Sequence, residues 1–469
     1  MPASLRSPLC LAALLLATST ATAQVRYVDA SAPPGGDGAS WATAHARLQD
    51  ALAVATSGEV RIAAGQYTPA APGGPRSSTF APIANIALRG GYVGGTGLGP
   101  TPDTRDPAVY RTILSGDLNN DDGPGFTNRA DNVYHVLTLN NRSSAMLVDG
   151  VTIRGGNADG PTELIGGGVI GLSCSAQFVS CTFRDNSAFR AGGVYTTLTI
   201  AANGAPRFRG CSFTGNRATD SYAGALYSTN SASRVPMSLV SCVFRDNTAF
   251  IFAGAFFIDV FDVTMINCEI VANAASGQAT STAGAGEINN GAASMINCTI
   301  ADNAAAPGWA GGVLLLSVGA PAVTNCVFWN NSGNQIVASP SAVVSYSDVQ
   351  GGAAGPGNIS ADPLFRDPAN RDYSLGAGSP AINAGSNTPF LTAAAPLGLA
   401  GDVAGVARFL SPPGAPTPGA GVGVGPVIDM GAREFAGARP CPGDFDGNGS
   451  VDFFDLNAVL SAYGQPCPR

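Results

Sequence analysis

The residues best suited to chemistry stand near the C-terminus, where oxygen-bearing side chains recur at nearly every second position. Their spacing is that of a 12-residue calcium loop, which takes ligands from positions 1, 3, 5, 7, 9 and 12 and has a glycine at position 6, here Gly449. Oxygen ligands in this arrangement bind Ca²⁺, with residue 7 contributing its backbone carbonyl. The sequence therefore predicts a calcium site formed by Asp444, Asp446, Asn448, Ser450, Asp452 and Asp455.

A short amphipathic helix is expected to follow this loop. Residues 453–463 place apolar side chains on one side of a helix, as a calcium loop-helix unit requires. Cys441 and Cys467 stand on either side of the unit, and in an oxidising compartment they can close a disulfide worth roughly 3 kcal/mol. The apolar positions are Leu456, Val459, Leu460 and Tyr463.

A second acidic cluster lies in residues 115–125. Asp117, Asn119 and Asp121 occupy alternate positions there, which is compatible with a weak calcium site. The same residues are also typical of a solvated loop, and we favour that interpretation.

Composition excludes several classes of enzyme and partner. The 469 residues include no lysine, so all 24 basic residues are arginines, and neither a Schiff-base enzyme nor a P-loop lysine is possible. The two histidines, His45 and His135, leave little for metal or triad catalysis, and the alternating pattern around His135 favours a structural role. A net charge of −8 disfavours nucleic acid as a partner, because phosphate binding needs clustered positive charge.

The first residues have the organisation of an export signal. Arg6 precedes the apolar run of residues 9–17, and residues 21–23 form a small-residue cleavage site. We expect residues 1–23 to be removed and the mature protein to be secreted, extracellular or at the cell surface. No later apolar run has the length of a membrane-spanning helix, so no transmembrane helix is expected after removal of the signal.

The middle of the chain repeats the pattern C-x-[FI]-x-x-N six times at intervals of 26 to 31 residues. Such a period is the signature of a solenoid in which each repeat forms one coil. The cysteines are Cys181, Cys211, Cys242, Cys268, Cys298 and Cys326. The asparagines are Asn186, Asn216, Asn247, Asn273, Asn303 and Asn331. The aromatic or aliphatic residues between them are Phe183, Phe213, Phe244, Ile270, Ile300 and Phe328.

Alternating strands and turns in each repeat predict an all-β fold, the parallel β-helix. Each cysteine and the apolar residue two positions later share one face of a strand, so both should point inward. The asparagine at the turn is expected to adopt the left-handed conformation and to pass amide hydrogen bonds to the next coil. An earlier coil, ending at Asn157, has Val151 where the cysteine would stand.

The repeated cysteines have three possible roles. Zinc sites use paired ligands such as C-x₂-C, which the repeats lack, and disulfides between adjacent coils would need distortion. Single cysteines one coil apart are typical of small buried side chains, and we favour this interpretation. Cys174 stands outside the pattern, and no role follows for it.

These repeats resemble those of secreted right-handed parallel β-helix proteins of the pectate-lyase-like superfamily, in the branch related to the chlamydial polymorphic outer-membrane protein repeats. The shared pattern pairs F-x-x-N, here residues 183–186, with a glycine pair and an apolar residue, here residues 192–194. The start of the chain, with a helix expected over residues 43–55, resembles the capping helix and first coil of these proteins. Residues 361–435 resemble their closing segment.

The calcium unit resembles a single-loop dockerin module, because Asp455 stands where an EF-hand loop usually has glutamate. Dockerins usually carry two such loops, whereas this chain has one. The resemblance implies Ca²⁺ as cofactor and a cohesin-like or other anchoring protein as partner. The expected organisation is a signal peptide (1–23), an N-terminal cap with the first coils (24–130), β-helix repeats (131–350), a closing segment (351–438) and the dockerin-like module (439–469).

The superfamily includes polysaccharide lyases and glycoside hydrolases, so the resemblance raises a catalytic role. The candidate residues are two Arg-Asp pairs, Arg184 with Asp185 and Arg245 with Asp246. Because these pairs stand two coils apart, their carboxylates are expected about 9.6 Å from each other, near the upper end of the range found in inverting glycosidases. Charged residues beside a surface turn explain the same pattern, and we favour this interpretation.

The function we favour is non-catalytic adhesion or binding. A long stacked face is a suitable platform for an extracellular polysaccharide or a surface protein. The alternative is a polysaccharide lyase or glycoside hydrolase. The aromatic residues that can offer ring faces for contact are Tyr195, Tyr222, Tyr227, Phe250, Phe252 and Trp309.

Overall fold

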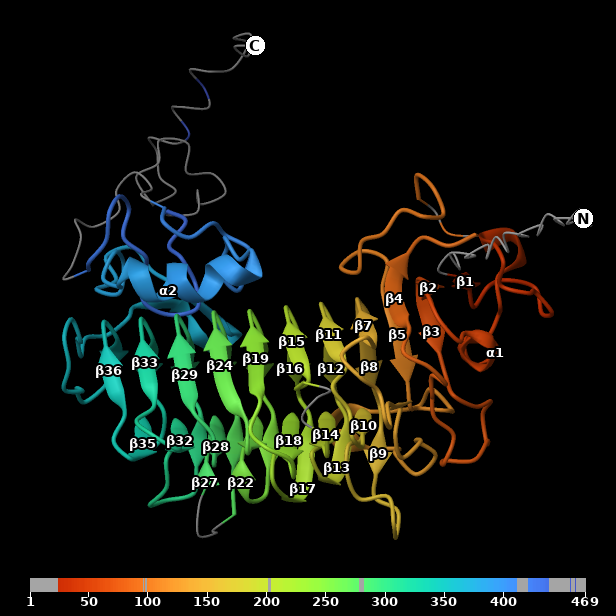
Figure 1. Cartoon of the computed structure of the whole chain (residues 1–469), viewed down its shortest axis with the longest axis horizontal. Helices are drawn as coiled ribbons and strands as arrows, with labels where there is room; N and C mark the ends of the chain where they lie inside the picture. Colours follow the sequence, from red (N-terminus) through yellow and green to blue (C-terminus); the bar gives the residue numbers. More distant parts are fainter. Residues whose placement is uncertain are drawn as a thin grey trace, which may run out of the picture.

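The computed structural model describes residues 24–437, except 96, 98, 201–203, 278–281 and 411–420, together with Leu456 and Leu460. In this part the chain winds through successive coils, and each coil adds a strand to long parallel sheets (Figure 1). The predicted all-β parallel β-helix is therefore confirmed. None of the helices among these residues has the length and apolar character needed to cross a membrane.

Three long sheets form the walls of the β-helix. The first sheet contains β1 (Val25–Val28), β2 (Glu59–Ala63), β4 (Ala87–Tyr92), β7 (Leu147–Asp149), β11 (Gln177–Val179), β15 (Arg207–Arg209), β19 (Pro236–Val240), β24 (Asp262–Ile266), β29 (Ala293–Ile296), β33 (Ala322–Thr324) and β36 (Val343–Ser345). The second contains β3 (Gly65–Tyr67), β5 (Thr112–Ser115), β8 (Val151–Arg154), β12 (Thr182–Arg184), β16 (Ser212–Thr214), β20 (Val243–Arg245), β25 (Glu269–Val271), β30 (Thr299–Ala301), β34 (Val327–Trp329) and β37 (Asp348–Val349). The third contains β6 (Leu137–Thr138), β10 (Val169–Gly171), β14 (Val194–Leu198), β18 (Leu226–Asn230), β23 (Phe256–Asp259), β28 (Gly286–Asn289), β32 (Val313–Leu316) and β35 (Ile336–Ser339).

Shorter elements complete the coils and the two ends. A fourth parallel sheet lies between the second and the third in the six central coils and contains β9 (Asn157–Ala158), β13 (Ser187–Arg190), β17 (Arg217–Ser221), β21 (Thr248–Ala249), β26 (Ala274–Ala275) and β31 (Ala304–Ala305). Two small sheets pair β22 (Phe252–Ala253) with β27 (Thr282–Ala283), and β38 (Phe365–Asp367) with β39 (Asp372–Leu375). The helices are α1 (Leu48–Val54), α2 (Asn387–Ala394) and the 3₁₀ helices η1 (Trp41–Thr43), η2 (Pro124–Phe126), η4 (Pro368–Asn370) and η5 (Ala395–Leu397).

The turns between sheets depend on single residues with positive φ. The residue before each repeat cysteine adopts this conformation, as at Ser180 with φ of 49°. At the next turn the sequence-based prediction was wrong, because the left-handed residue is the one before each asparagine and not the asparagine itself. The asparagine instead directs its backbone N–H and its side-chain amide towards the asparagine of the next coil. These left-handed residues are Asp185, Gly215, Asp246, Ala272, Asp302 and Asn330.

A column of buried asparagine amides runs along the second of these turns. Asn216 donates from its backbone N–H and from Nδ2 to the Asn247 Oδ1, at 3.0 and 2.9 Å. The same two bonds join each asparagine to the next in the column. Because every member is at most 5% exposed, these bonds replace water for polar groups that have no other access to it. The members are Asn186, Asn216, Asn247, Asn273, Asn303 and Asn331.

The coil before the first repeat joins this column through its backbone. Val151 is buried at the position that cysteine takes in later coils, and Gly156 donates its N–H to the Asn186 Oδ1 at 3.0 Å. Asn157 lies one residue beyond the position of the asparagine column, and its Nδ2 donates instead to the Arg129 carbonyl at 3.1 Å. Placing Asn157 in the repeat was therefore wrong, because the register aligns it with Ser187.

The interior is filled by the apolar residues of the repeats. The rings of Phe213 and Phe244 stack at 4.5 Å between centroids with their planes 2° apart, and all six repeat positions are fully buried. The repeat thiols lie beside them and are free. The Cys268 Sγ, for example, donates to the carbonyls of Leu239 and Ile266 at 3.4 and 3.5 Å, and burial raises its pKa.

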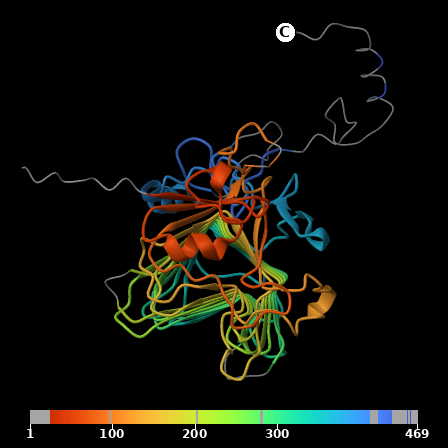
Figure 2. The ribbon, with the colours of Figure 1, turned by 90° about the vertical axis from the view of Figure 1, so that its right-hand side faces the viewer.

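A helix covers the N-terminal end of the stack, as predicted. Helix α1 lies across the first coil and buries Leu48, Ala51 and Leu52 (Figure 2). It begins at Leu48, later than expected, because the backbone around His45 pairs with Val28 of the edge strand β1. This pairing and the helix together cover an edge that could otherwise pair with another chain.

The closing segment lies along the turn between the first two sheets in the C-terminal half of the stack, where Figure 1 shows α2 above β24, β29 and β33. Phe390 and Ala394 of α2 pack with Ile428 against Ile266 and Ile296 at the ends of β24 and β29. The described residues of the closing segment therefore lie over the C-terminal coils of the stack (Figure 1).

Candidate functional site

The structure separates the two Arg-Asp pairs predicted from the sequence. The Arg245 Nη2 lies 3.0 Å from the Oε1 of Glu269, which is fully buried and also binds the Arg433 Nε at 2.6 Å. Asp246 forms an ion pair with Arg371 at 2.7 Å. Both arginine partners, Arg371 and Arg433, belong to the closing segment. This pair therefore holds the closing segment on the β-helix.

The other pair, Arg184 and Asp185, borders a surface cleft. Its volume is about 340 Å³, and it lies between the loop that contains η2 and the ends of β8 and β12. Arg184 and Asp185 are 3.5 Å apart and nearly half exposed, so their ion pair is loose. The cleft is lined by Asp122, Gly123, Pro124, Gly125, Phe126, Arg129, Arg154, Gly155, Arg184 and Asp185.

An aromatic ring held by arginines forms one wall of this cleft. The Arg129 guanidinium lies 4.7 Å from the ring centroid of Phe126, and the Arg217 guanidinium lies 5.7 Å from it. Phe126 has φ of 65°, a conformation that an aromatic residue rarely adopts. Arg129 is fixed by a 2.6 Å hydrogen bond to the Asp185 carbonyl. The ring and its cations are therefore pre-positioned at the surface.

Among the lining residues of the cleft, Asp122 is a carboxylic acid whose pKa is shifted towards neutrality. Burial raises its pKa to about 6, although hydrogen bonds from Asn132 and the charge of Arg129 oppose this shift. The Arg129 Nε lies 3.1 Å from the Asp122 Oδ1, and burial lowers the pKa of that arginine. Asp122 can thus gain or lose a proton near neutral pH, which is the property of a general acid or base.

Next to this aspartate, the predicted acidic cluster brings three carboxylates together. Oxygens of Asp117, Asp121 and Asp131 all lie within 4.8 Å of one another. Asp131 takes the place expected for Asn119, whose backbone N–H donates to it at 2.8 Å. Asp117 is 1% exposed, whereas Asn119 and Asp121 are exposed, so the cluster joins a buried carboxylate to a solvated loop of the kind that we expected. Three oxygen donors at this separation have the chemistry to hold a divalent cation.

His135 has structural partners. Its Nδ1 lies 3.0 Å from the Gly166 carbonyl and its Nε2 lies 2.9 Å from the Glu163 Oε2. These contacts link neighbouring coils in the register that pairs β6 with β10. They match the structural role expected for this histidine.

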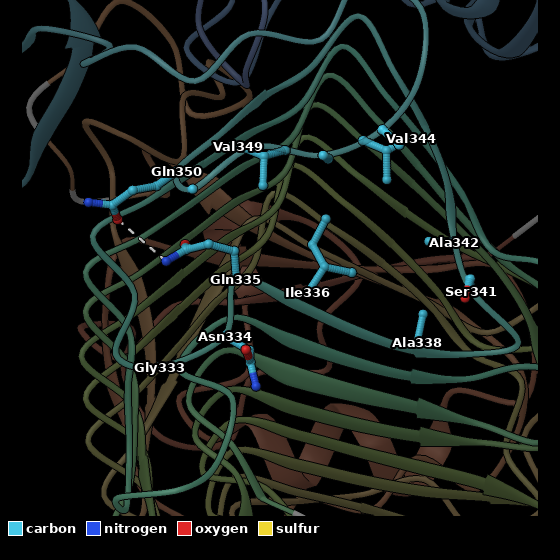
Figure 3. A pocket seen from close by; sticks show the side chains of 14 residues that line it. Gly333, Asn334, Gln335, Ile336, Ala338, Ser341, Ala342, Val344, Val349 and Gln350 are labelled. Carbon is cyan, nitrogen blue, oxygen red and sulfur yellow. Dashed lines mark hydrogen bonds between the residues drawn. The ribbon is translucent and has the colours of Figure 1, made fainter.

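A larger cavity lies at the C-terminal end of the stack, but its lining offers no acidic or basic side chain. It measures about 530 Å³, and Figure 3 shows Ile336, Val344 and Val349 facing it, with a hydrogen bond between Gln335 and Gln350 at its rim. None of its lining residues is titratable. Size alone therefore does not make it the functional site.

Sequence reasoning missed three asparagines that position the closing segment. Each stands directly before a repeat cysteine, and their Nδ2 groups donate to the carbonyls of Gly401, Asp429 and Ser386 at 2.8 Å. In the first three repeats the same position is serine or glycine. That change in residue type was visible in the sequence, and it marks where the closing segment begins to cover the coils. The asparagines are Asn267, Asn297 and Asn325.

The predicted calcium ligands Asp444, Asp446, Asn448, Ser450, Asp452 and Asp455 lie outside the described residues, as do Cys441 and Cys467. Of the predicted 453–463 helix, Leu456 and Leu460 are described, and both are helical. Cys174 is buried and free, and burial raises its pKa to about 11.

Comparison with known proteins yields no family. Neither a protein-family model nor a curated protein matches this chain. Among solved structures, the pectate lyase Pel9A matches with 15% sequence identity and a TM-score of 0.37, over 87% of this chain and 96% of that chain. At that score the likeness carries no argument about activity. The β-helix assignment stands on the strand order and register described above.

Proposed function

We propose that this protein is an exported β-helix that binds acidic polysaccharide, without cleaving it, at the cleft around Phe126. The observation that carries the proposal is the set of arginines at this cleft in a chain whose net charge is −8. Arg129, Arg154 and Arg184 line the cleft, and Arg217 stands beside the same ring. Arg129 and Arg184 have carboxylate partners in the cleft, Asp122 and Asp185, whereas Arg154 and Arg217 form no ion pair in the described part of the chain. The two unpaired guanidinium groups favour an anionic ligand.

The arrangement of these groups suits a charged sugar. A guanidinium can bind a carboxylate or sulfate through two parallel hydrogen bonds, and an aromatic ring offers a face to the apolar side of a sugar ring. Arg184 is 42% exposed and only loosely paired, so it is accessible to a ligand. The Arg154 Nη2 donates a solvent-exposed hydrogen bond to the Gln66 Oε1 at 3.1 Å, which a ligand can replace.

A binding role agrees with the contacts that the other two candidate residues make. Arg245 and Asp246 are paired with groups that hold the closing segment, so they are not free for catalysis. The alternative function, a polysaccharide lyase or glycoside hydrolase, is favoured by the position of Asp122 in the cleft lining, where burial raises its pKa to about 6. Release of cleaved sugar products by the wild-type protein would distinguish an enzyme from a binding protein.

We extend the proposal to attachment of the protein through its predicted C-terminal calcium module, residues 439–469. The ligand spacing between Asp444 and Asp455 supports Ca²⁺ binding by a dockerin-like module, and an anchoring partner would hold the protein at an extracellular surface. The export signal in residues 1–23 supports the same location.

Affinity electrophoresis tests this function. Native gels containing polygalacturonate, alginate or chondroitin sulfate, and gels with neutral polysaccharides as controls, would be run with the wild-type protein and with Arg184→Gln. Loss of one charged hydrogen bond should weaken retention in acidic gels by about tenfold or more. The matched control is Arg207→Gln, an exposed arginine of β15 on the first sheet.

Two results would contradict the proposal. Equal retention of the wild type and Arg184→Gln in every acidic gel would exclude the cleft as the binding site. Release of unsaturated products or reducing ends by the wild type, lost in Asp122→Asn, would replace binding by catalysis.

A further inference from the structure

Five aromatic side chains gather on the outer side of the third sheet. Tyr195, Tyr227 and Phe257 are aligned in register on β14, β18 and β23. Tyr222 lies just before β18, and Phe252 belongs to the short strand β22. The rings of Tyr222 and Tyr227 stack at 4.2 Å, and those of Tyr195 and Tyr227 meet edge to face at 5.1 Å. All except Phe257 are half-buried. We call these five residues the aromatic stripe.

Two rings of the stripe are placed by an unfavourable backbone conformation. Tyr222 and Phe252 have φ of 70° and 69°, where glycine is preferred. Both rings pack with one side against Ala223, Ala253 and Phe257 and remain partly exposed. Backbone strain that presents a side chain to the surface is characteristic of functional positions.

A polar column accompanies the stripe. Two residues further along the same strands, Thr197, Thr229, Asp259 and Asn289 are aligned in register on the same side of the sheet. They offer hydroxyl, carboxylate and amide groups to a ligand lying on the stripe. The Asn289 Oδ1 has no hydrogen-bond partner among the described residues.

The stripe leads into a pocket of about 260 Å³ formed by the following coils. In register, Phe257 is followed by the buried Glu287 and then by Leu314, which lines the pocket together with Trp309. Thr282 also lines the pocket; it is fully buried, and its hydroxyl lacks a partner in the part of the chain that the structure describes.

We propose that the aromatic stripe and this pocket bind an extended neutral polysaccharide chain along the axis of the β-helix. Aromatic faces stack on pyranose rings, and the polar column can bind the ring hydroxyls. Adjacent coils are about 4.8 Å apart, close to the advance of one sugar unit in an extended chain. The charged groups beside the rings have both signs: the Arg190 guanidinium lies over Tyr222 at 5.5 Å, Asp259 belongs to the polar column, and the buried Glu287 stands beside Phe257 in register. The stripe shares no residue with the cleft at Phe126, so this inference is independent of the proposed function.

The decisive variant is Tyr222→Gly. It removes a ring of the stripe and relieves the left-handed backbone, which offsets part of the packing lost with the ring, so the variant should remain folded. Calorimetric titration with cellohexaose, xylohexaose and mannohexaose should show at least one hexasaccharide that binds the wild type and binds Tyr222→Gly about tenfold more weakly. Phe252→Gly should behave in the same way.

The matched control is Leu364→Gly, which replaces an exposed left-handed residue away from the stripe and should leave affinity unchanged. Tyr227→Phe, which keeps the ring, should also bind normally. The proposal is overturned if the wild type binds none of the three hexasaccharides, or if Tyr222→Gly is folded and binds as tightly as the wild type. Arg184→Gln should keep full affinity for the neutral hexasaccharide, which distinguishes this site from the acidic cleft.

Discussion

Replacing Asn247 by alanine should destabilise the β-helix more than any exposed asparagine substitution. The side chain donates from Nδ2 to the Phe213 carbonyl and to the Asn273 Oδ1, both at 2.9 Å. Its Oδ1 accepts from the backbone N–H and from Nδ2 of Asn216. The substitution therefore removes four hydrogen bonds at a fully buried position. At about 1 kcal/mol each, the loss is about 4 kcal/mol, and the stranded Asn216 N–H makes this a lower bound.

Guanidinium unfolding, followed by circular dichroism, measures this loss. The matched control is Asn334→Ala, an exposed asparagine near the end of the same column, which should change the free energy of unfolding by less than about 0.5 kcal/mol. Coils of a solenoid can unfold separately, so the transition midpoint of the least stable unit is the quantity to compare. A loss below about 1 kcal/mol in Asn247→Ala would refute the view that the amide column holds the coils together.

Three further predictions concern buried groups and the tail. Burial raises the pKa of Asp348 to about 7, so the folded state retains a proton that the unfolded state releases near pH 4, and stability should fall as the pH rises between these values. Asp348→Asn should flatten that dependence in unfolding curves at about pH 5 and pH 8, and an unchanged slope would contradict the assignment. Asp444→Ala in the full chain should remove one bound Ca²⁺ in calorimetry, and an unaltered stoichiometry would reject the calcium loop. Cys268→Ser should lower stability by about 1–2 kcal/mol without altering polysaccharide retention, whereas a stable variant that loses retention would give this thiol a functional role.

The coil could be predicted because its determinants are local. Cys268, Ile270 and Asn273 lie within six positions of one another, and strand alternation alone decides which of them face inward. The left-handed residue was misplaced by one position, because Ala272 gives no compositional sign of the conformation that it adopts. Asn157 was misassigned for a similar reason, since a one-residue shift of register is invisible when both candidate residues suit a turn.

The candidate site was less predictable because its residues come from distant parts of the chain. Arg371 binds Asp246 across 125 positions, and Arg433 binds Glu269 across 164 positions. No spacing rule links such residues, so Arg245 and Asp246 looked available for chemistry. The cleft at Phe126 depends on Arg129 reaching the Asp185 carbonyl across 56 positions. The repeat pattern identified Asp185, but it could not show that Phe126 and Arg129 would lie beside it.

The most direct test of the central claim is a crystal structure with an acidic oligosaccharide, taken from whichever polymer retains the protein in gels. We expect an intact sugar chain in the cleft, with a carboxylate or sulfate within hydrogen-bond distance of Arg154 or Arg184 and a sugar ring against Phe126. A cleaved chain beside Asp122 would show an enzyme, and an empty cleft with the sugar bound elsewhere would exclude the cleft as the binding site.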